Sequence, residues 1–572
     1  MRKSTQFVIS AALSLLIFNL TSCGGGGDEP GNNGGGSTIN LPENIYLYYL
    51  TGWTVGSELV AVDPTNPPMP TDPKDTLLSE VNYLSSFNDI TPDFNDFNVN
   101  DRATLDLTGY TFEPYVIALN STGFSKFSAD LLKPNTISKV STATGGILCD
   151  IDRFTDINKE YYIYETSDDG CATIARRQMI NSEMDSATTP VDVPIMPMTE
   201  LFNTQLQLTG WLANNNGELT RYDADFSSPI DIDTLPEGIS YLYPLPTPLG
   251  TYLLISFSDL FIYDPTANSL TNVYSASSGA VGIYDYNLDG IVFVDGNTIY
   301  RANWAFSSPP EIIATESNAA SIDPYWTFSK ELLVYSYSQA SGEIILVALD
   351  LVTGDKTILD TLPSGDTVQL ADGTPGRLFY NVSGPSTRRA ESVLFDNTGR
   401  QSFDNARWVG SAYGNQLDDQ GYYTDITMIL LNNTLPGQTD LNDTVLESYD
   451  ANSMGKISDL GALPDGFEDD FIFGIHGSNK ALLFNLSLTS NRSDEVFFMS
   501  PLVDGSLQRL TDNDTNDIAL SGSIARLGSG PTGAPFSGSD MRGDQEVSGF
   551  LKSSNKNMLF RKIRAVQQKA PR

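Results

Sequence analysis

Short runs of strand-forming residues, divided by turn residues, extend along the chain from Pro42 to about Gly530. The runs are rich in Tyr, Phe, Val, Ile and Thr, and clusters of Asn, Asp and Gly separate them. No long stretch of this region places apolar residues at helical spacing. Because β-branched and aromatic residues favour strands, and Asn, Asp and Gly favour tight turns, the pattern predicts an all-β protein.

One strand motif recurs in this region: an acidic or polar residue, a short run of strand residues, then Asp or Asn at a turn. Neighbouring copies are mostly roughly 40 to 55 residues apart, and Leu50-Thr51-Gly52-Trp53 returns as Leu208-Thr209-Gly210-Trp211. The copies are Glu58–Asp63, Glu218–Asp223, Asp259–Asp264, Glu343–Asp350, Ser392–Asp396, Thr444–Asp450 and Glu495–Asp504, with looser ones at Tyr115–Asn120, Cys171–Arg176 and Thr298–Asn303. This period is typical of a β-propeller, a ring of four-stranded antiparallel sheets.

The strand Ile344–Leu349 is apolar on both faces, as expected for a sheet that packs between two others. One blade cannot bury two faces alone, whereas a closed ring can. We therefore expect residues 41–550 to form a single propeller, of eight blades by the repeat spacing, within a range of seven to ten. Two stacked β-sandwiches are the alternative fold.

The N-terminus has the layout of a secretory signal peptide: basic Arg2 and Lys3, an apolar run from Phe7 to Leu20, and small residues before Cys23. It resembles the lipobox of bacterial lipoproteins, which implies cleavage after residue 22 and acylation of Cys23. The apolar run is too short to span a bilayer, so acyl chains would anchor the protein. Residues 23–40 are glycine-rich and predict a flexible tether.

By the same resemblance, Gly24 in place of an Asp after the cysteine implies the outer membrane as destination, and the leaflet stays open. The net charge of −38 excludes nucleic acid as a partner, since nucleic-acid binders neutralise phosphates with Lys and Arg. The charge suits cations or basic partners, or solvation alone. Residues 551–572 have the opposite charge: this C-terminal segment is basic, and its composition is consistent with a tail, an edge strand or a docking segment.

Two cysteines remain besides Cys23, namely Cys149 and Cys171. An oxidising envelope compartment favours a disulfide between them. The loop it would close has roughly twenty residues and would stabilise the fold by about 3 kcal/mol in the chain-entropy model.

Two segments resemble the repeat of TolB-type propellers, a WD40-like class. The first is Asp323–Ser336, with its continuation Leu349–Gly354, and the second runs from Val496–Met499 to Arg509–Asn513. The Ser-Pro-Asp-Gly turn of that family is replaced here by Thr327–Lys330. TolB's own N-terminal domain has no counterpart. The resemblance implies a propeller platform for protein partners at the cell envelope.

Catalytic signals are sparse. The sequence has a single histidine, His476, which disfavours a catalytic zinc site. His476 lies in a segment typical of a hairpin turn. The Gly-x-Ser-x-Gly elbow of serine hydrolases is absent from the sequence. Carboxylate pairs remain available, so the alternative function is a carboxylate-dependent carbohydrate-active enzyme, a glycosidase or lyase. Trp side chains at 53, 211, 304, 326 and 408 would suit either sugar stacking or blade packing.

A calcium site is the one candidate cofactor site. Asp285, Asn287 and Asp289, followed by Gly290, match the start of a calcium loop, but the twelfth position is Gly296 instead of Glu. An ordinary Asp-Gly hairpin turn explains the same residues. The sequence thus predicts an outer-membrane lipoprotein whose propeller binds an envelope or surface protein or another ligand, with no firm cofactor.

Overall fold

The computed structural model describes 10 segments before residue 146, and most of the chain from 146 to 520. The early segments are 37–38, 47–51, 57–62, 67, 76–81, 102–106, 109–113, 115–120, 123–130 and 133–143. From 146 to 520 the description omits 156–159, 170–171, 182–189, 203–207, 216, 235–242, 248, 257, 279–280, 287–289, 320–321, 325–331, 375, 414–415, 418–424, 437, 439–440, 468–472, 479–480, 491–492 and 514–516.

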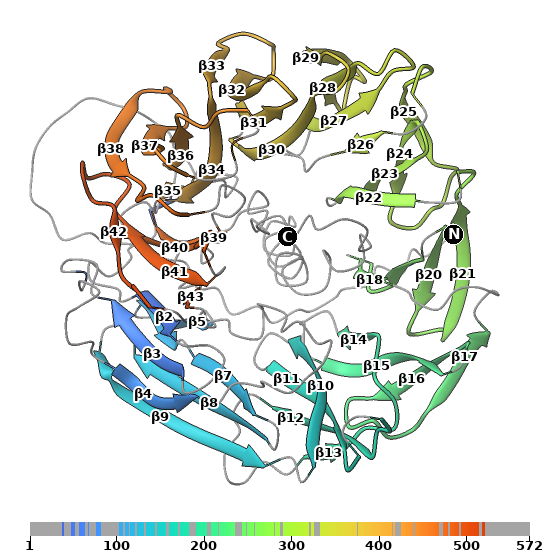
Figure 1. Ribbon diagram of the computed structural model, residues 1–572. Helices are drawn as coiled ribbons and strands as arrows, with labels where there is room; N and C mark the ends of the chain where they lie inside the picture. Colours follow the sequence, from blue (N-terminus) through green and yellow to red (C-terminus); the bar gives the residue numbers. More distant parts are fainter. Residues whose placement is uncertain are drawn as a thin grey trace, which may run out of the picture. The chain divides into compact units, whose positions relative to one another are not determined.

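The prediction of an all-β protein is confirmed for this part of the chain, which contains strands and turns and no helix (Figure 1). Accordingly, none of the described residues belongs to a helix that is long and apolar enough to cross a membrane. The strands form nine four-stranded sheets, one three-stranded sheet and two strand pairs, all antiparallel.

Eight of the four-stranded sheets are built from strands in chain order. They are β10 (Ile147–Thr155), β11 (Glu160–Ser167), β12 (Arg176–Asn181) and β13 (Val191–Asp192); β14 (Thr199–Phe202), β15 (Leu208–Asn215), β16 (Glu218–Asp223) and β17 (Ile230–Thr234); β18 (Tyr243–Pro246), β19 (Tyr252–Ile255), β20 (Asp259–Asp264) and β21 (Ser269–Ser275); β22 (Val281–Tyr286), β23 (Gly290–Asp295), β24 (Thr298–Asn303) and β25 (Glu311–Thr315); β26 (Asp323–Pro324), β27 (Leu332–Ser338), β28 (Ile344–Asp350) and β29 (Lys356–Leu362); β30 (Thr367–Gly373), β31 (Arg377–Ser383), β32 (Arg388–Leu394) and β33 (Gln401–Asp404); β34 (Ala406–Tyr413), β36 (Ile426–Asn432), β37 (Val445–Asp450) and β38 (Lys456–Ala462); and β39 (Phe473–Ser478), β40 (Ala481–Ser487), β41 (Asp494–Met499) and β42 (Gln508–Arg509).

The ninth sheet joins the two ends of the described chain, and we name it the closing sheet. Its order is β43 (Ile518–Leu520), β2 (Leu47–Thr51), β3 (Ser57–Val62) and β4 (Thr76–Val81). The remaining strands are β7 (Tyr115–Asn120), β8 (Gly123–Asp130) and β9 (Lys133–Ala143) in the three-stranded sheet, and the pairs β5 (Arg102–Asp106) with β6 (Gly109–Glu113) and β1 (Ser37–Thr38) with β35 (Gln416–Leu417).

Each four-stranded sheet packs against the next through buried apolar side chains. For example, Leu346 of β28 and Val393 of β32 share one cluster, and Leu483 of β40 and Tyr49 of β2 share another. Such clusters join every successive pair from sheet β10–β13 to the closing sheet. Since each buried aliphatic or aromatic side chain contributes about 1.5–3 kcal/mol, these contacts are the main source of stability.

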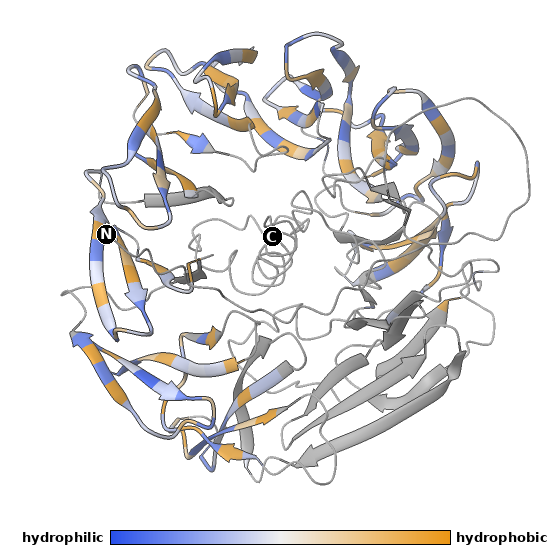
Figure 2. Ribbon diagram, turned by 180° about the vertical axis from the view of Figure 1, so that it is seen from behind, coloured by the Kyte–Doolittle hydropathy of each residue, from blue (hydrophilic) through white to orange (hydrophobic). Residues whose placement is uncertain are grey.

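The sequence motif corresponds to one position in the sheets. Every full copy from Glu58–Asp63 to Glu495–Asp504 includes the third strand of a sheet, and the final Asp lies at or near the turn to the fourth. The middle strands are apolar on both faces, as Ile344–Leu349 predicts: Ile345, Leu346, Val347 and Leu349 are all buried. Coloured by hydropathy, the described strands carry both hydrophobic and hydrophilic residues (Figure 2).

The outer strands are irregular in a repeated way. In six of them extra residues interrupt the pairing with the third strand: in β4, and at Ile232, Val273, Ile313, Leu359, Ile457 and Leu460 in the other five. Such a bulge bends and twists an edge strand and hinders pairing with another chain.

Candidate functional site

Aspartates cap the turns between third and fourth strands. Oδ1 of Asp264 accepts hydrogen bonds from the backbone N–H groups of Thr266 (2.8 Å) and Ala267 (3.2 Å). Oδ1 of Asp350 does the same for Val352 (2.7 Å) and Thr353 (2.8 Å). A carboxylate that bonds to the backbone two and three residues ahead fixes the turn. The Asp of the repeat motif is therefore a structural turn residue.

Asp396 and Asp450 repeat this geometry in two further sheets. Oδ1 of Asp396 accepts from the N–H of Thr398 (2.9 Å), and Oδ1 of Asp450 accepts from the N–H of Ser453 (2.7 Å). The bonds from Thr353 and Val352 lower the pKa of Asp350, and those from Thr398 lower the pKa of Asp396. Asp350 and Asp396 are thus ionised at neutral pH.

The turns also contact the preceding sheet. Arg221 of β16 donates to the carbonyl of Pro265 (3.1 Å) and to Oδ1 of Asn268 (3.3 Å), both in the turn after β20. In another sheet the N–H of Asp459, in β38, donates to Oδ1 of Asp504 (2.9 Å) in the turn after β41. Each such turn is therefore held from two sides, which makes it a rigid surface element.

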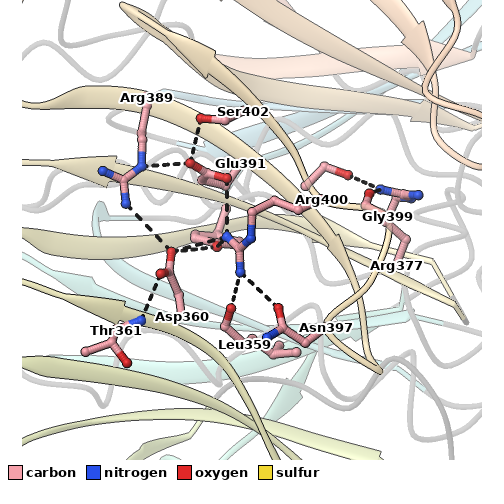
Figure 3. A network of polar contacts seen from close by, with 12 residues as sticks. Leu359, Asp360, Thr361, Arg377, Arg389, Glu391, Asn397, Gly399, Arg400 and Ser402 are labelled. Carbon is pink, nitrogen blue, oxygen red and sulfur yellow. Dashed lines mark hydrogen bonds and ion pairs between the residues drawn. The ribbon is translucent and has the colours of Figure 1, made fainter.

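The densest charged cluster lies between sheets β26–β29 and β30–β33 (Figure 3). Arg400 Nη1 lies 3.4 Å from Oδ2 of Asp360, in β29, and 3.4 Å from Oε2 of Glu391, in β32. Arg389 Nε lies 2.7 Å from Oε1 of Glu391, and its Nη2 lies 3.7 Å from Oδ2 of Asp360. Two guanidinium groups thus share two carboxylates across the boundary between the sheets.

Neutral groups complete this cluster. The hydroxyl of Tyr380, in β31, donates to Oδ2 of Asp360 (2.8 Å), and Ser402 donates to Oε1 of Glu391 (2.7 Å). Arg400 also donates to the carbonyl of Leu359 and to Oδ1 of Asn397 (Figure 3). The Glu391 side chain is 4% exposed and that of Arg400 is 34% exposed, so the cluster runs from the interior to the surface.

The same design recurs at other sheet boundaries. Tyr335, in β27, donates to Oε1 of Glu316, which follows β25, and Lys356 Nζ lies 2.6 Å from the same oxygen. Tyr274, in β21, donates to Oδ2 of Asp295 in β23 (2.8 Å). Three boundaries thus have a tyrosine–carboxylate pair. These contacts join neighbouring sheets. Their carboxylates face cations or hydroxyl groups, as in a structural network of ion pairs and hydrogen bonds.

The positions of the predicted site residues are as follows. Cys23, Cys171, Asn287 and Asp289 lie outside the described residues. Cys149 lies in β10 and Asp285 in β22, and their side chains are not among those described. In the part of the chain that the structure describes, no group of three or more His, Cys, Asp and Glu could hold a metal ion. The acylation, the disulfide and the calcium turn therefore stay predictions.

The Asp-Gly segment of the calcium motif joins two antiparallel strands, β22 and β23. A Cβ at Gly290 would lie 1.9 Å from the carbonyl oxygen of Ala302 in β24. The glycine is therefore required by the close approach of the neighbouring strand, whether or not a cation binds. Gly210 of the repeated Leu-Thr-Gly-Trp segment has the same role, since its Cβ would lie 2.3 Å from the carbonyl oxygen of Tyr222.

His476 is not in the turn of its hairpin. It lies within β39, opposite Leu483 of β40, and the pairing continues to Ser478 and Ala481. The interpretation as a turn residue was wrong because the strand extends two residues further than the Gly-Ser-Asn sequence indicates. Three of the tryptophans are buried where neighbouring sheets pack, so they serve packing and not sugar stacking: Trp211, Trp304 and Trp408. Trp53 and Trp326 lie outside the described residues.

Sequence reasoning missed the aromatic residue at the fourth position of the second strand. It is Trp211, Phe293, Tyr335, Tyr380 and Phe484 in five sheets. All five are less than 2% exposed. The signal was available, because each lies one strand before a copy of the third-strand motif.

No protein-family model matches the sequence, and the search of curated proteins gives no match. Among solved structures, the dipeptidyl peptidase 4 of Porphyromonas gingivalis is 12% identical with a TM-score of 0.33, over 53% of this chain and 52% of that chain. A eukaryotic initiation factor is 10% identical with a TM-score of 0.40, over 82% of this chain and 100% of that chain. TolB from Acinetobacter baumannii is 13% identical with a TM-score of 0.23, over 54% and 80%. The chain spans about half the length of the dipeptidyl peptidase.

Proposed function

We propose that the successive sheets form a single β-propeller closed by the pairing of β43 with β2. Two observations support this: buried clusters join each four-stranded sheet to the next, and the closing sheet combines both ends of the described chain. The four-stranded sheets would give nine blades, one more than the repeat spacing favours and within the range of seven to ten. The sheet β7–β9, which contacts β4 through β9, occupies the place of a further blade in the chain order.

We propose that this propeller is the binding or scaffold module of an outer-membrane lipoprotein. The observation that carries the proposal is the set of rigid, Asp-capped turns at one end of the sheets. A surface that is fixed before binding loses little conformational entropy when a partner docks. Its ionised carboxylates would select partners with basic groups.

The anchor is Cys23, through the lipobox resemblance. Cys23→Ser would remove the thiol that accepts the acyl chains. The variant is expected to stay unprocessed or unanchored, with loss from the detergent phase on phase partitioning. Normal detergent-phase partitioning of Cys23→Ser would contradict the lipoprotein assignment.

The test of binding uses the acylated full chain as bait in native envelope preparations. Asp355 and Asp404 are both exposed acids, but Asp355 lies in a third-to-fourth turn and Asp404 ends β33 at the opposite end of its sheet. If a partner binds the turns, the Asp355→Lys variant should retain several-fold less of it than wild type does. The difference should be largest at low salt, because salt screens exposed charges. The Asp404→Lys variant should retain as much of the partner as wild type does. Retention that does not distinguish the two variants from wild type would count against the turn surface.

A carboxylate-dependent carbohydrate-active enzyme is the alternative function. Among the described residues, Asp360 and Glu391 are one pair of acids close together, and both contact Arg389 and Arg400. Groups engaged in this way hold the sheets together, and the binding module therefore accounts better for the geometry.

A further inference from the structure

The turn after β41 exposes aliphatic side chains beside carboxylates. Leu502 is 46% exposed and Val503 is 53% exposed, and Asp504 follows them. Asp504 accepts from the N–H of Asp459, whose side chain is 67% exposed, and the N–H of Gly505 donates back to the Asp459 carbonyl (2.7 Å). We name Leu502, Val503, Asp504, Asp459 and the 38%-exposed Ile457 the turn patch.

The turn patch is rigid and only partly neutralised. Two hydrogen bonds tie the turn to β38, one accepted by the Asp504 carboxylate and one accepted by the Asp459 carbonyl, and Leu502 and Val503 remain exposed. Lys456 contacts Asp459 and lies 3.0 Å from Oε1 of Glu447. Asp504 makes its described contact with a backbone N–H, which leaves its negative charge without a cation among the described residues.

The chain leaves the described region at the end of the sheets that carries this patch. Strands β43 and β3 are both antiparallel to β2, so β43 runs in the same direction as β3. Leu520 therefore lies at the end of the closing sheet where the third strand ends, which is the end that carries the third-to-fourth turns. The closing sheet packs directly against sheet β39–β42, to which Leu502 and Val503 belong.

The sequence after Leu520 has a composition that complements the patch. No acidic residue follows Glu546, whereas Lys552, Lys556, Arg561, Lys562, Arg564, Lys569 and Arg572 are basic. Leu559, Ile563 and Val566 are spaced as on one face of a helix. The residues from 521 to 551 can span up to about 100 Å when extended, at roughly 3.3–3.6 Å per residue, so reach does not limit docking.

We propose that the basic segment 552–572 docks on the turn patch of its own chain. Its aliphatic side chains would cover Leu502 and Val503, and its basic side chains would meet Asp459 and Asp504. Both the apolar contact and the charge pairing are then satisfied by one occupant whose chain already emerges at this end of the sheets. A docked segment would also compete with an external partner for this part of the turn surface.

The test uses a photo-crosslinking amino acid at position 503 in the full chain. Val352 provides a matched control, since it is 66% exposed in the equivalent turn after β28, three sheets earlier in the chain. We expect crosslinks within one chain from position 503 to peptides of 552–572, and none from position 352. Crosslinks between two chains, equal yields at both positions, or no crosslink to this segment would overturn the proposal.

A second measurement does not depend on the crosslinker. Docking shields the basic segment from trypsin, so Val503→Asn, which removes the apolar contact and adds no charge, should speed cleavage after Arg561 and Lys562 several-fold. Val352→Asn should leave the rate unchanged. Mass spectrometry of the released peptides gives the rates. Unchanged cleavage in a folded Val503→Asn protein would overturn the proposal.

Discussion

The hydroxyl of Tyr380 lies 2.8 Å from Oδ2 of Asp360 and joins two neighbouring sheets through a single hydrogen bond to a carboxylate. Arg400 Nη1 lies 2.6 Å from the same hydroxyl oxygen and 3.4 Å from the carboxylate. Burial, followed by the charge of Asp360, raises the pKa of Tyr380, so the phenol stays protonated and remains a donor. A donor that is fixed in this way holds the two sheets in register.

Removing this hydroxyl should destabilise the protein. Tyr380→Phe keeps the ring and leaves Asp360 with one donor fewer in a partly buried site, for a loss of about 1–3 kcal/mol. Tyr222→Phe is the control, because Tyr222 is also buried, at 6% exposed, and no hydrogen bond of its hydroxyl is found among the described residues. Its loss should stay within about 0.5 kcal/mol. Urea unfolding followed by tryptophan fluorescence measures both. Equal midpoints for the two variants would contradict a role for the hydrogen bond.

The pH dependence of stability should include Asp295. Burial acts to raise the pKa of Asp295, but hydrogen bonds from Ser278, Ser277 and Tyr274 outweigh it and hold that pKa at about 2. A carboxylate whose pKa is lower in the folded than in the unfolded state stabilises the fold at any pH above its unfolded pKa, which is near 3.9 for Asp. This stabilisation is lost as the pH falls from about 4 toward 2.

Asp295→Asn should therefore lower the melting temperature at pH 7, and the difference from wild type should shrink between about pH 4 and pH 2. Asp404→Asn is a matched control at an exposed acid. A difference for Asp295→Asn that is constant from pH 7 to pH 2 would show that the charge of Asp295 is not the cause.

The Asp-capped turns permit a test that separates charge from geometry. Asp350→Asn keeps an oxygen that can accept from Val352 and Thr353, whereas Asp350→Ala removes it. Asparagine and aspartate both support this type of turn. We expect the alanine variant to melt about 1–2 °C below wild type, for a loss of about 1–2 kcal/mol in a domain of this size, and the asparagine variant to stay close to it. Equal losses for both would mean that the negative charge, and not the turn geometry, matters.

The full copies of the sequence motif mark the third strands of seven sheets, because each of these strands is followed by a turn that favours Asp, and both requirements are local. The looser copy Tyr115–Asn120 is instead β7, the first strand of the three-stranded sheet. The sequence did not reveal the pairs Tyr380–Asp360 and Tyr335–Glu316. Their members belong to different sheets, and their contact depends on how those sheets pack. The carboxylates Asp360 and Glu316 follow no fixed spacing from the tyrosines, so the repeat alone could not assign them. Cys23, Cys171 and the residues from Asn287 to Asp289 lie outside the described residues, and predictions about them rest on sequence.

The disulfide between Cys149 and Cys171 stays a prediction from the sequence. Cys149 lies in β10, and Cys171 lies outside the described residues. We expect no free thiol when the purified protein is labelled after denaturation without reduction. Two reactive thiols per chain under these conditions would remove the disulfide.

The last prediction concerns catalysis. Asp360 and Glu391 are held by Arg389 and Arg400, so we expect the full chain to give no products from envelope, plant or algal polysaccharides, with or without calcium, in a reducing-end assay. Calcium that binds the folded state would still raise the melting temperature by mass action, so a thermal shift alone does not indicate an enzyme. Glu391→Gln and Asp360→Asn should instead shift urea unfolding, because each removes a negative charge that faces the two half-buried arginines Arg389 and Arg400. Sustained turnover that disappears in either variant, while the variant remains folded, would replace the binding module by the carboxylate enzyme.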